Sequence, residues 1–400
     1  MCYSYRMQFH KTSYLWILLA LLFVSDCLAT ASPVTHKEYF VYIGTYTQQE
    51  STSKGIYAYR YDATKAHLTR IGLAAEAINP SFLAVHPNHH FLYAVNEVSN
   101  YQSEKSGEKS GAVSAFAIDR SSGKLTLLNR VSSRGADPCY ATVDKTGKYV
   151  LVANYTGGSV AVFPVLEDGR LGEASAFVQH SGHGTNPERQ EGPHAHSIDV
   201  TPDNRFAIVD DLGLDETLVY PFDSTKGSLA AGSPEIAKAA PGAGPRHFAL
   251  HPSGKFGYVI NEMQSTVSVF HYDSVSGKLE NVEAISSLPK TFSGHDESAE
   301  IEVHPSGKFL YASNRGHDSI AVFAIDKLMG TLAPVEYIST KCASPRNFEI
   351  DPTGTLLFAA NEKSDNIVVF RINQQNGKLT PTGKILEISQ PVCVKFVPMD

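Results

Sequence analysis

Short runs of apolar residues alternate with polar turns along most of the chain. The segment NPSFLAVHPNHHFLYAVNE (79–97) has two such runs, joined by a turn rich in Pro, Asn and His. Runs of four to eight residues that are rich in Val, Leu, Phe and Tyr, and bounded by turn residues, predict β-strands. This segment therefore predicts a strand, a turn and a second strand.

The same pattern recurs through the chain in one register. Full copies occupy residues 137–155, 244–262, 297–315 and 344–362, and HAHSIDVTPDNRFAIVDDL (194–212) is a further copy in which Ala195 replaces the leading proline. A seventh copy is split, because PVCVKFVPMD ends the chain and FVYIGTY (40–46) supplies the matching second strand. A third apolar run follows each copy, and a fourth, weaker one follows a turn such as S-G-K-L, whose glycine suits positive φ.

Seven units of four antiparallel strands, one completed by both chain ends, predict an all-β fold. We expect a seven-bladed β-propeller over residues 38–400, whose last blade pairs the N- and C-terminal strands. Closure of the ring removes exposed sheet edges. A linear β-solenoid is the alternative, but it needs capping ends and does not explain a split unit.

The innermost strand of a propeller blade lines the central channel, and here it is predicted to be the first strand of each copy. The position after its leading proline is occupied around the ring by Ser81, Cys139, His196, Arg246, Ala299, Arg346 and Val392. The position that follows the second strand holds Glu97, Tyr155, Leu212, Glu262, Arg315, Glu362 and Tyr46. The asparagines just before this second position are expected to make turn hydrogen bonds.

The first 31 residues differ in kind from the rest. Arg6 and Lys11 precede an apolar run over residues 14–24, and Ala29-Thr30-Ala31 follows. This order predicts a secretory signal peptide over residues 1–31, a short extension over 32–37, and an exported, periplasmic or secreted protein. The run is short for an uncleaved membrane anchor, so no membrane association is expected after cleavage.

The net charge and the cysteines restrict the kinds of partner and site that the chain can have. The formal net charge is −7, and no basic face is visible, which argues against a nucleic-acid partner. Cys139, Cys342 and Cys393 lie beyond the signal, show no metal-ligand spacing, and are interpreted as structural. The oligomeric state stays open.

The segment ERQEGPHAHSI (188–198) is the main candidate for chemistry. His196 occupies the same channel position as Arg246 and Arg346, and His194 is expected to point the same way if its strand begins that early. A long polar loop (179–192) precedes them, as is common at active sites. A metal site would need a third ligand, for which His183, His247, Glu262 and Asp211 are candidates. A hydrogen-bonded pair without chemistry is the other alternative.

The motifs RQ-x-x-PH-x-H (Arg189, Gln190, His194, His196), GPRH (244–247) and NE (261–262), in this order and on this repeat, resemble the seven-bladed lactonase family. That family includes propeller-type 6-phosphogluconolactonases and is related to carboxymuconate cyclases. The resemblance covers about residues 38 to 400. It implies hydrolysis of a sugar lactone, either 6-phospho-D-glucono-1,5-lactone or an unphosphorylated aldonolactone, with a catalytic set at His196 (or His194), Arg246 and Glu262.

Lactone hydrolysis needs an activated water, a donor for the developing oxyanion and a proton for the leaving ring oxygen. We expect Arg246 to polarise the carbonyl, and Glu262 or His196 to activate water, without metal or cofactor. His194, His247, Arg346, Arg189 and Gln190 are the predicted substrate contacts. An export signal favours a neutral aldonolactone. A lactonising cyclase and a non-catalytic binding scaffold are the alternative functions.

Overall fold

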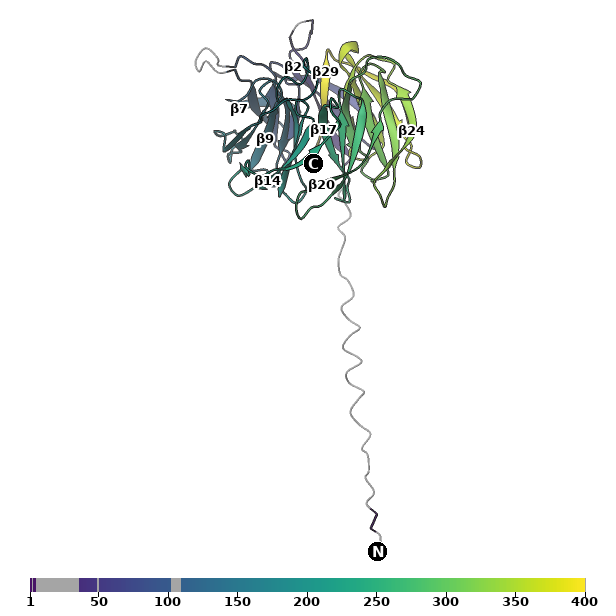
Figure 1. Cartoon of the computed structure of the whole chain (residues 1–400). Coiled ribbons are helices and arrows are strands. Elements are labelled where there is room, and N and C mark those ends of the chain that lie inside the picture. Colours follow the sequence, from purple (N-terminus) through teal and green to yellow (C-terminus); the bar gives the residue numbers. More distant parts are fainter. Residues whose placement is uncertain (2, 5–35, 49, 102–108, 400) are drawn as a thin grey trace. The chain divides into compact units, whose positions relative to one another are not determined.

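The β-strands form seven antiparallel sheets arranged as the blades of a propeller (Figure 1). The computed structural model describes residues 1, 3–4, 36–48, 50–101 and 109–399, and residues 36–400 form one compact unit. The predicted signal segment lies almost wholly outside the described residues. Among the described residues, no helix is long and apolar enough to cross a lipid bilayer.

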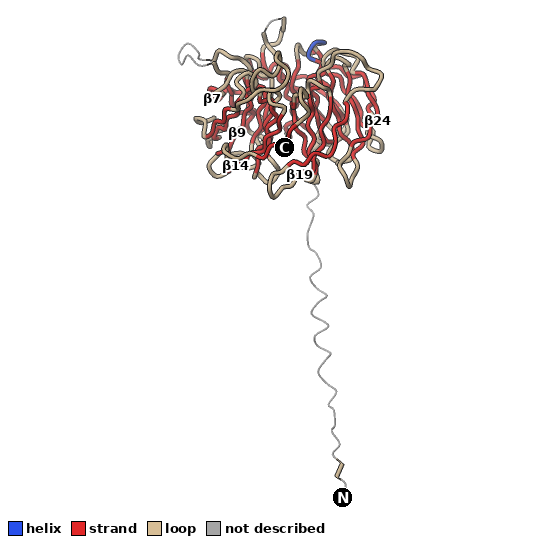
Figure 2. Tube along the Cα trace, in the orientation of Figure 1, coloured by secondary structure: helices blue, strands red, loops and turns tan. Residues whose placement is uncertain are grey.

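Six blades have four strands. In five of them the strands run from the channel outward in chain order, and in blade 7 the last strand of the chain, β29, is innermost. Blade 1 contains β4 (Leu83–Val85), β5 (Phe91–Asn96), β6 (Ala112–Ile118) and β7 (Leu125–Ser132), and blade 2 contains β8 (Pro138–Val143), β9 (Tyr149–Asn154), β10 (Ser159–Pro164) and β11 (Ala176–Gln179). Blade 4 contains β17 (Pro245–Leu250), β18 (Phe256–Asn261), β19 (Thr266–Tyr272) and β20 (Leu279–Ser286), and blade 5 contains β21 (Ser298–Val303), β22 (Phe309–Asn314), β23 (Ser319–Ile325) and β24 (Leu332–Ser339). Blade 6 contains β25 (Pro345–Ile350), β26 (Leu356–Asn361), β27 (Asn366–Ile372) and β28 (Leu379–Glu387), and blade 7 contains β29 (Pro391–Pro398), β1 (Glu38–Thr45), β2 (Gly55–Asp62) and β3 (His67–Glu76). The 3₁₀ turn η1 (Glu362–Ser364) is the blue segment of Figure 2.

Blade 3 departs from the four-strand prediction. It contains β12 (Ala195–Val200), β13 (Phe206–Asp211), β14 (Glu216–Asp223), β15 (Ser228–Leu229) and β16 (Glu235–Lys238). Both β15 and β16 pair with β14, one at each end, so the outer strand is interrupted over residues 230–234. The residues there, AAGSP, include Gly and Pro, which weaken a strand.

The ring closes as the split copy predicts. β29 pairs with β1 from Tyr39–Pro398 to Thr45–Pro391, and the innermost strands contact one another in the order β4, β8, β12, β17, β21, β25, β29 and back to β4. In Figure 1 the yellow β29 accordingly stands beside the purple N-terminal strands. The fold prediction is confirmed.

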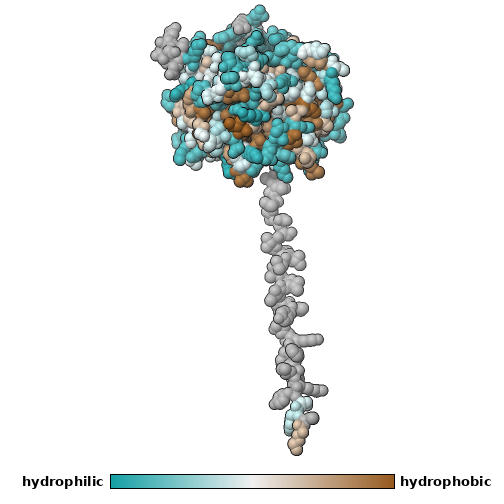
Figure 3. All heavy atoms as spheres, in the orientation of Figure 1, coloured by the Kyte–Doolittle hydropathy of each residue, from teal (hydrophilic) through white to brown (hydrophobic). Residues whose placement is uncertain are grey.

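The buried core lies between successive blades. Inner and middle strands such as β9 and β26 are buried along their whole length, which is why their sequences are continuous apolar runs. The outermost strands alternate buried and exposed residues, and the visible face of the ring is mainly hydrophilic with scattered apolar patches (Figure 3).

Two hydrogen bonds recur between neighbouring blades. The His304 imidazole lies 2.8 Å from the carbonyl of Gly354 in the next blade, and the Tyr311 hydroxyl donates to the carbonyl of Gly377 at 2.8 Å. Gly354 and Gly377 have φ near +70° and +75°, a conformation that other residues rarely adopt. These bonds hold the blades in register and thereby fix the channel.

Candidate active site

A β-bulge places the predicted channel residues. In β17, Pro245 pairs with Asn261 and His247 with Ile260, so Arg246 is the extra residue between them. The same shift occurs around His196 in blade 3 and around Arg346 in blade 6. A bulge redirects side chains, which lets two consecutive residues, Arg246 and His247, line one cavity.

These residues enclose a cavity in the channel, which we call the channel cavity. Its upper part has a volume of about 270 Å³ and is lined by Glu97, Cys139, Tyr155, Arg189, His196, Glu262, Glu297, Arg315 and Arg346. Its lower part is narrow, about 10 Å³, and is lined by Tyr46, Ser81, Phe82, Glu97, Cys139, His196, Arg246, His247, Glu300, Arg346, Asn347 and Val392. Glu97, Cys139, His196 and Arg346 line both parts, whereas Arg246 lines only the lower part and Glu262 only the upper part.

Glu262 is the centre of an arginine cluster. Its carboxylate lies 2.9 Å from Nε of Arg246, 2.9 Å from Nη2 of Arg315 and 2.5 Å from Nη2 of Arg189. Glu297 adds a second carboxylate, 2.7 Å from Nη1 of Arg189. Glu262 is only 4% exposed, so these charge-assisted bonds lie largely out of water.

The cluster sets the charge states of its members. Burial opposes ionisation of Glu262, but Arg315 and Arg246 outweigh it and hold the pKa of this carboxyl well below its usual range. Burial and the neighbouring Arg315 and Arg346 lower the pKa of Arg246 to about 10, so its guanidinium stays charged at neutral pH. Glu262 is therefore a fixed anion, unsuited to accepting a proton from water.

Glu300 holds His247 in one tautomer. Nδ1 of His247 lies 2.9 Å from Glu300, and because a carboxylate only accepts, Nδ1 carries the proton. Nη1 of Arg246 lies 3.1 Å and 3.4 Å from the two ring nitrogens, so it sits against the ring face. Burial lowers the pKa of His247 to about 4, although Glu300 opposes the shift, so the ring is neutral.

His196 faces the same space. Its ring centroid lies 5.2 Å from that of His247, and its Nε2 lies 3.9 Å from Glu262. Burial, together with the charge of Arg246, holds the pKa of His196 well below 6.5. His196 is thus a neutral imidazole that lines both parts of the channel cavity and can accept a proton.

Cys139 lies beside His196 without being a nucleophile. Its Sγ lies 3.2 Å from the carbonyl oxygen of His196, and burial raises the pKa of the thiol well above 9. A buried thiol with a raised pKa is inert, since the thiolate is the reactive form. Cys139, Cys342 and Cys393 all carry free thiols.

The structure brings six of the eight predicted site residues to the channel cavity, namely His196, Arg246, Glu262, His247, Arg346 and Arg189. His194 does not line it, because β12 begins only at Ala195. The His194 ring instead stacks on Tyr155 at 4.6 Å and lies 3.3 Å from Glu191.

Gln190 is also not a lining residue. Its Nε2 donates to the Leu212 carbonyl at 2.8 Å and to Asp215 at 2.7 Å, and its Oε1 accepts from the backbone of Thr185 and Asn186. Gln190 is 1% exposed and fastens the loop that carries Arg189. Both polar atoms of its side chain thus bond within the protein, and its predicted contact with the substrate stays a prediction.

The candidate metal ligands do not converge. Within the described part of the chain, no three His, Cys, Asp or Glu side chains are arranged to hold a metal ion. Asp211 lies 2.6 Å from His180, and His183 lies 2.9 Å from the carbonyl of Gly184. That the site needs no metal stays a prediction.

Sequence reasoning did not single out several lining residues. Glu97, Tyr155 and Arg315 stand at the position after the second strand of each copy, which the repeat predicts to lie near the channel. Nothing in the sequence distinguishes them as site residues from the other residues at that position. Glu300 and Asn347 reach the lower part because the bulge shifts the alternation by one residue.

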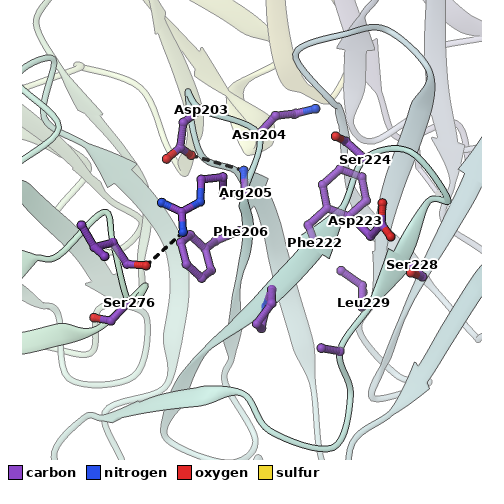
Figure 4. Close-up of a pocket in the computed structure, with 13 residues that line it drawn as sticks. Asp203, Asn204, Arg205, Phe206, Phe222, Asp223, Ser224, Ser228, Leu229 and Ser276 are labelled. Carbon is purple, nitrogen blue, oxygen red and sulfur yellow. Dashed lines mark hydrogen bonds between the residues drawn. The ribbon is translucent and has the colours of Figure 1, made fainter.

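A larger surface cavity lies elsewhere, at the turns of blade 3. It has a volume of about 730 Å³ and is lined by Asp203, Arg205, Phe206 and Phe222, among others (Figure 4). Arg205 covers the Phe206 ring and donates to the carbonyls of Ser274 and Val275. The Arg205 guanidinium is thus already bonded within the protein, and fewer charged groups are free to bind a ligand here than in the channel.

Comparison with known proteins shows which proteins this chain resembles. The family described as "Lactonase, 7-bladed beta-propeller" matches residues 40–396. The chain is 38% identical to a 6-phosphogluconolactonase of Bacillus subtilis over 361 residues, which is 90% of this chain and 99% of that protein. It is 35% identical to a 6-phosphogluconolactonase of Formosa agariphila, over 77% of this chain and 85% of that one. The solved structure of a periplasmic gluconolactonase from Pseudomonas aeruginosa superposes with a TM-score of 0.82 at 31% identity, covering 91% and 100% of the two chains.

Proposed function

Because the chain belongs to the seven-bladed β-propeller lactonase family, we propose that it hydrolyses a sugar lactone in the channel cavity. The observation that carries this proposal is the convergence of His196, Arg246 and Arg346 on one buried space. The upper part, about 270 Å³, lies just below the range of about 300–1,000 Å³ common for drug-sized ligands, so it suits one monocyclic lactone.

The arginines bind the reacting carbonyl. Nε and Nη1 of Arg246 bond to Glu262, Ala299 and His247, whereas among the described residues no acceptor bonds to Nη2. This group is the donor we assign to the oxyanion, because preorganised donors stabilise the charge that develops on the carbonyl oxygen. Arg346, whose side chain is 20% exposed, receives the carboxylate of the product.

His196 activates the water. Its neutral ring can take a proton as the water oxygen attacks the carbonyl carbon, and a positioned base of this kind contributes about 10²–10⁴-fold. Glu262 is the alternative base, but its carboxylate is ion-paired with three arginines and is therefore unsuited to take a proton from water. Glu262 is instead the anion that holds the arginines in place.

We infer that the preferred substrate is an unphosphorylated aldonolactone. Three arginines (Arg189, Arg315, Arg346) line the upper part, and the first two already form ion pairs with Glu262 and Glu297. A phosphate dianion would need donors that Glu262 and Glu297 already occupy. The predicted export signal agrees with this choice, as phosphorylated sugars are metabolites of the cytoplasm.

The test is a direct assay of acid release. Purified protein is given D-glucono-1,5-lactone, its 6-phosphate, and a simple δ-lactone, with spontaneous hydrolysis subtracted. We expect the highest kcat/KM with the unphosphorylated sugar lactone. A preference for the phosphorylated substrate would overturn the substrate choice, and no turnover of any lactone would favour a cyclase or a binding scaffold.

A further inference from the structure

Glu97 is a carboxyl group that lines both the channel cavity and a neighbouring cavity. It follows β5 in blade 1, three blades away from Arg246, and lines both parts of the channel cavity. It also lines a neighbouring cavity of about 620 Å³ at the rim of blades 1, 6 and 7. Glu97 is partly exposed, so a molecule in the channel cavity can contact it.

Neutral donors hold the Glu97 carboxylate. Oγ of Ser81 donates to Oε2 of Glu97 at 2.5 Å, and the Tyr46 hydroxyl lies 3.1 Å from both carboxylate oxygens. Within the described part of the chain, no cation lies within ion-pair distance of Glu97. Glu262, on the same cavity, has three arginines within 2.9 Å.

This difference separates the proton affinities of the two carboxyls. Burial raises the pKa of Glu97, with Arg346 opposing the rise, whereas the arginine cluster holds the pKa of Glu262 far below its usual range. The groups that act on Glu97 come from four other segments: Tyr46 after β1, Ser81 before β4, Asp137 and Cys139 at the start of β8, and Arg346 in β25. When environments push two carboxyls apart in this way, one stays an anion and the other can carry a proton.

We propose that Glu97 is the general acid of the reaction, which protonates the ring oxygen of the lactone as its bond to the carbonyl carbon breaks. This role rests on the proposed function. It adds a proton donor that is already protonated when water attacks, whereas His196 gains a proton only in that first step. Glu97 is then a catalytic residue that lines both parts of the channel cavity.

The proton balance closes. In the first step the water oxygen bonds to the carbonyl carbon, and one water proton passes to His196 while Arg246 holds the oxyanion. In the second step the carbonyl re-forms, the ring C–O bond breaks, and the ring oxygen takes the proton of Glu97. Departure of the hydroxy acid leaves protonated His196 and ionised Glu97, and proton exchange with solvent restores both.

The test compares two leaving groups in matched substrates. Glu97→Gln is assayed on D-glucono-1,5-lactone and on its analogue with sulfur in place of the ring oxygen. A thiolate leaves without a proton, so we expect kcat/KM to fall by about 10² or more on the oxygen lactone and by less than about tenfold on the thiolactone. Glu76→Gln, an exposed carboxyl at the end of β3, should leave both rates unchanged.

A pH profile separates this role from a structural one. Wild-type kcat/KM should fall as pH rises through the pKa of Glu97, and Ser81→Ala should move that fall to higher pH, because it removes a hydrogen bond to the ionised form. Thermal unfolding of each variant checks that it is folded. An equal loss on both substrates, or a wild-type rate for Glu97→Gln, would refute the acid role. A wild type that hydrolyses no lactone would instead refute the proposed function itself.

Discussion

Nε of Arg246 lies 2.9 Å from the carboxylate of Glu262, and both side chains are buried, at 2% and 4% exposure. Arg246 lies in the first strand of its blade, and Glu262 directly follows the second strand, 16 positions later. The pair holds Arg246 at the lower part of the channel cavity, and among the described residues no protein acceptor bonds to its remaining donor, Nη2. We expect both catalysis and stability to depend on this pair, and different substitutions test each.

Arg246→Ala should reduce lactonase kcat/KM by about 10² or more, as is usual when an oxyanion donor is lost. The protein should remain folded, because Arg315 and Arg189 still neutralise Glu262. Steady-state kinetics measure the loss of activity, and circular dichroism checks that the variant is folded. Arg205→Ala, in the distant turn of blade 3, is the matched control and should keep the wild-type rate. Full activity in Arg246→Ala would show that the oxyanion is bound elsewhere.

Glu262→Gln should lower the free energy of unfolding by about 3 kcal/mol, because removing one partner leaves buried charges uncompensated. Urea unfolding at neutral pH measures this loss. Activity should fall as well, since the arginines lose their common anchor. An unfolding curve that matches wild type would mean that water already screens the cluster.

The free energy of unfolding of the wild type should depend on pH through the ionisation of Glu262. Its folded pKa is depressed relative to about 4.3 in the unfolded chain, so its contribution is complete above that pH and is lost as pH falls through the folded value. Unfolding free energies measured between about pH 2 and 7 should therefore rise with pH less steeply in Glu262→Gln than in wild type. Parallel curves would contradict the depressed pKa.

Chelation should leave the wild type active. The charge of Arg246 disfavours a cation beside His196, and among the described residues no three candidate ligands are arranged to hold a metal ion. Activity is measured after dialysis against EDTA, and then again with zinc or calcium added. If EDTA abolishes turnover and either metal restores it, the roles of His196 and Arg246 must be reassigned.

Cys139 should resist alkylation in the folded protein, because its thiol is buried and its pKa is raised. Iodoacetamide treatment followed by peptide mass spectrometry should label Cys139 only after denaturation, with activity retained before it. Rapid labelling with parallel loss of activity would indicate a thiolate in the channel cavity.

Export is predicted from the basic, apolar and Ala-x-Ala order of the first 31 residues. Mass spectrometry of periplasmic or secreted material should find an N-terminus near Ser32. Intact protein confined to the cytoplasm would contradict this prediction and weaken the case for a neutral substrate.

Much of the fold could be read from the sequence. Seven copies of one strand–turn–strand pattern determine seven blades, because each copy has the same apolar spacing and must bury the same faces. The split copy determines ring closure, and β29 pairs with β1 as it requires. The register of the repeat also marks the channel position, even in the copy where Ala195 replaces the leading proline, so His196 and Arg246 could be assigned to the channel from the sequence alone.

The directions and pairings of side chains were decided only in three dimensions. The bulge at Arg246 lets His247 line the same cavity, whereas β12 begins only after His194, which does not line it. The strict alternation of side chains along a strand predicts neither result. Glu97 and Glu262 occupy equivalent positions of the repeat, so the sequence makes them equal. Their difference arises because arginines from the loop before β12 and from blade 5 converge on Glu262 while Ser81 and Tyr46 meet Glu97. Electrostatic environment depends on which distant segments come together, and only the closed ring brings them together.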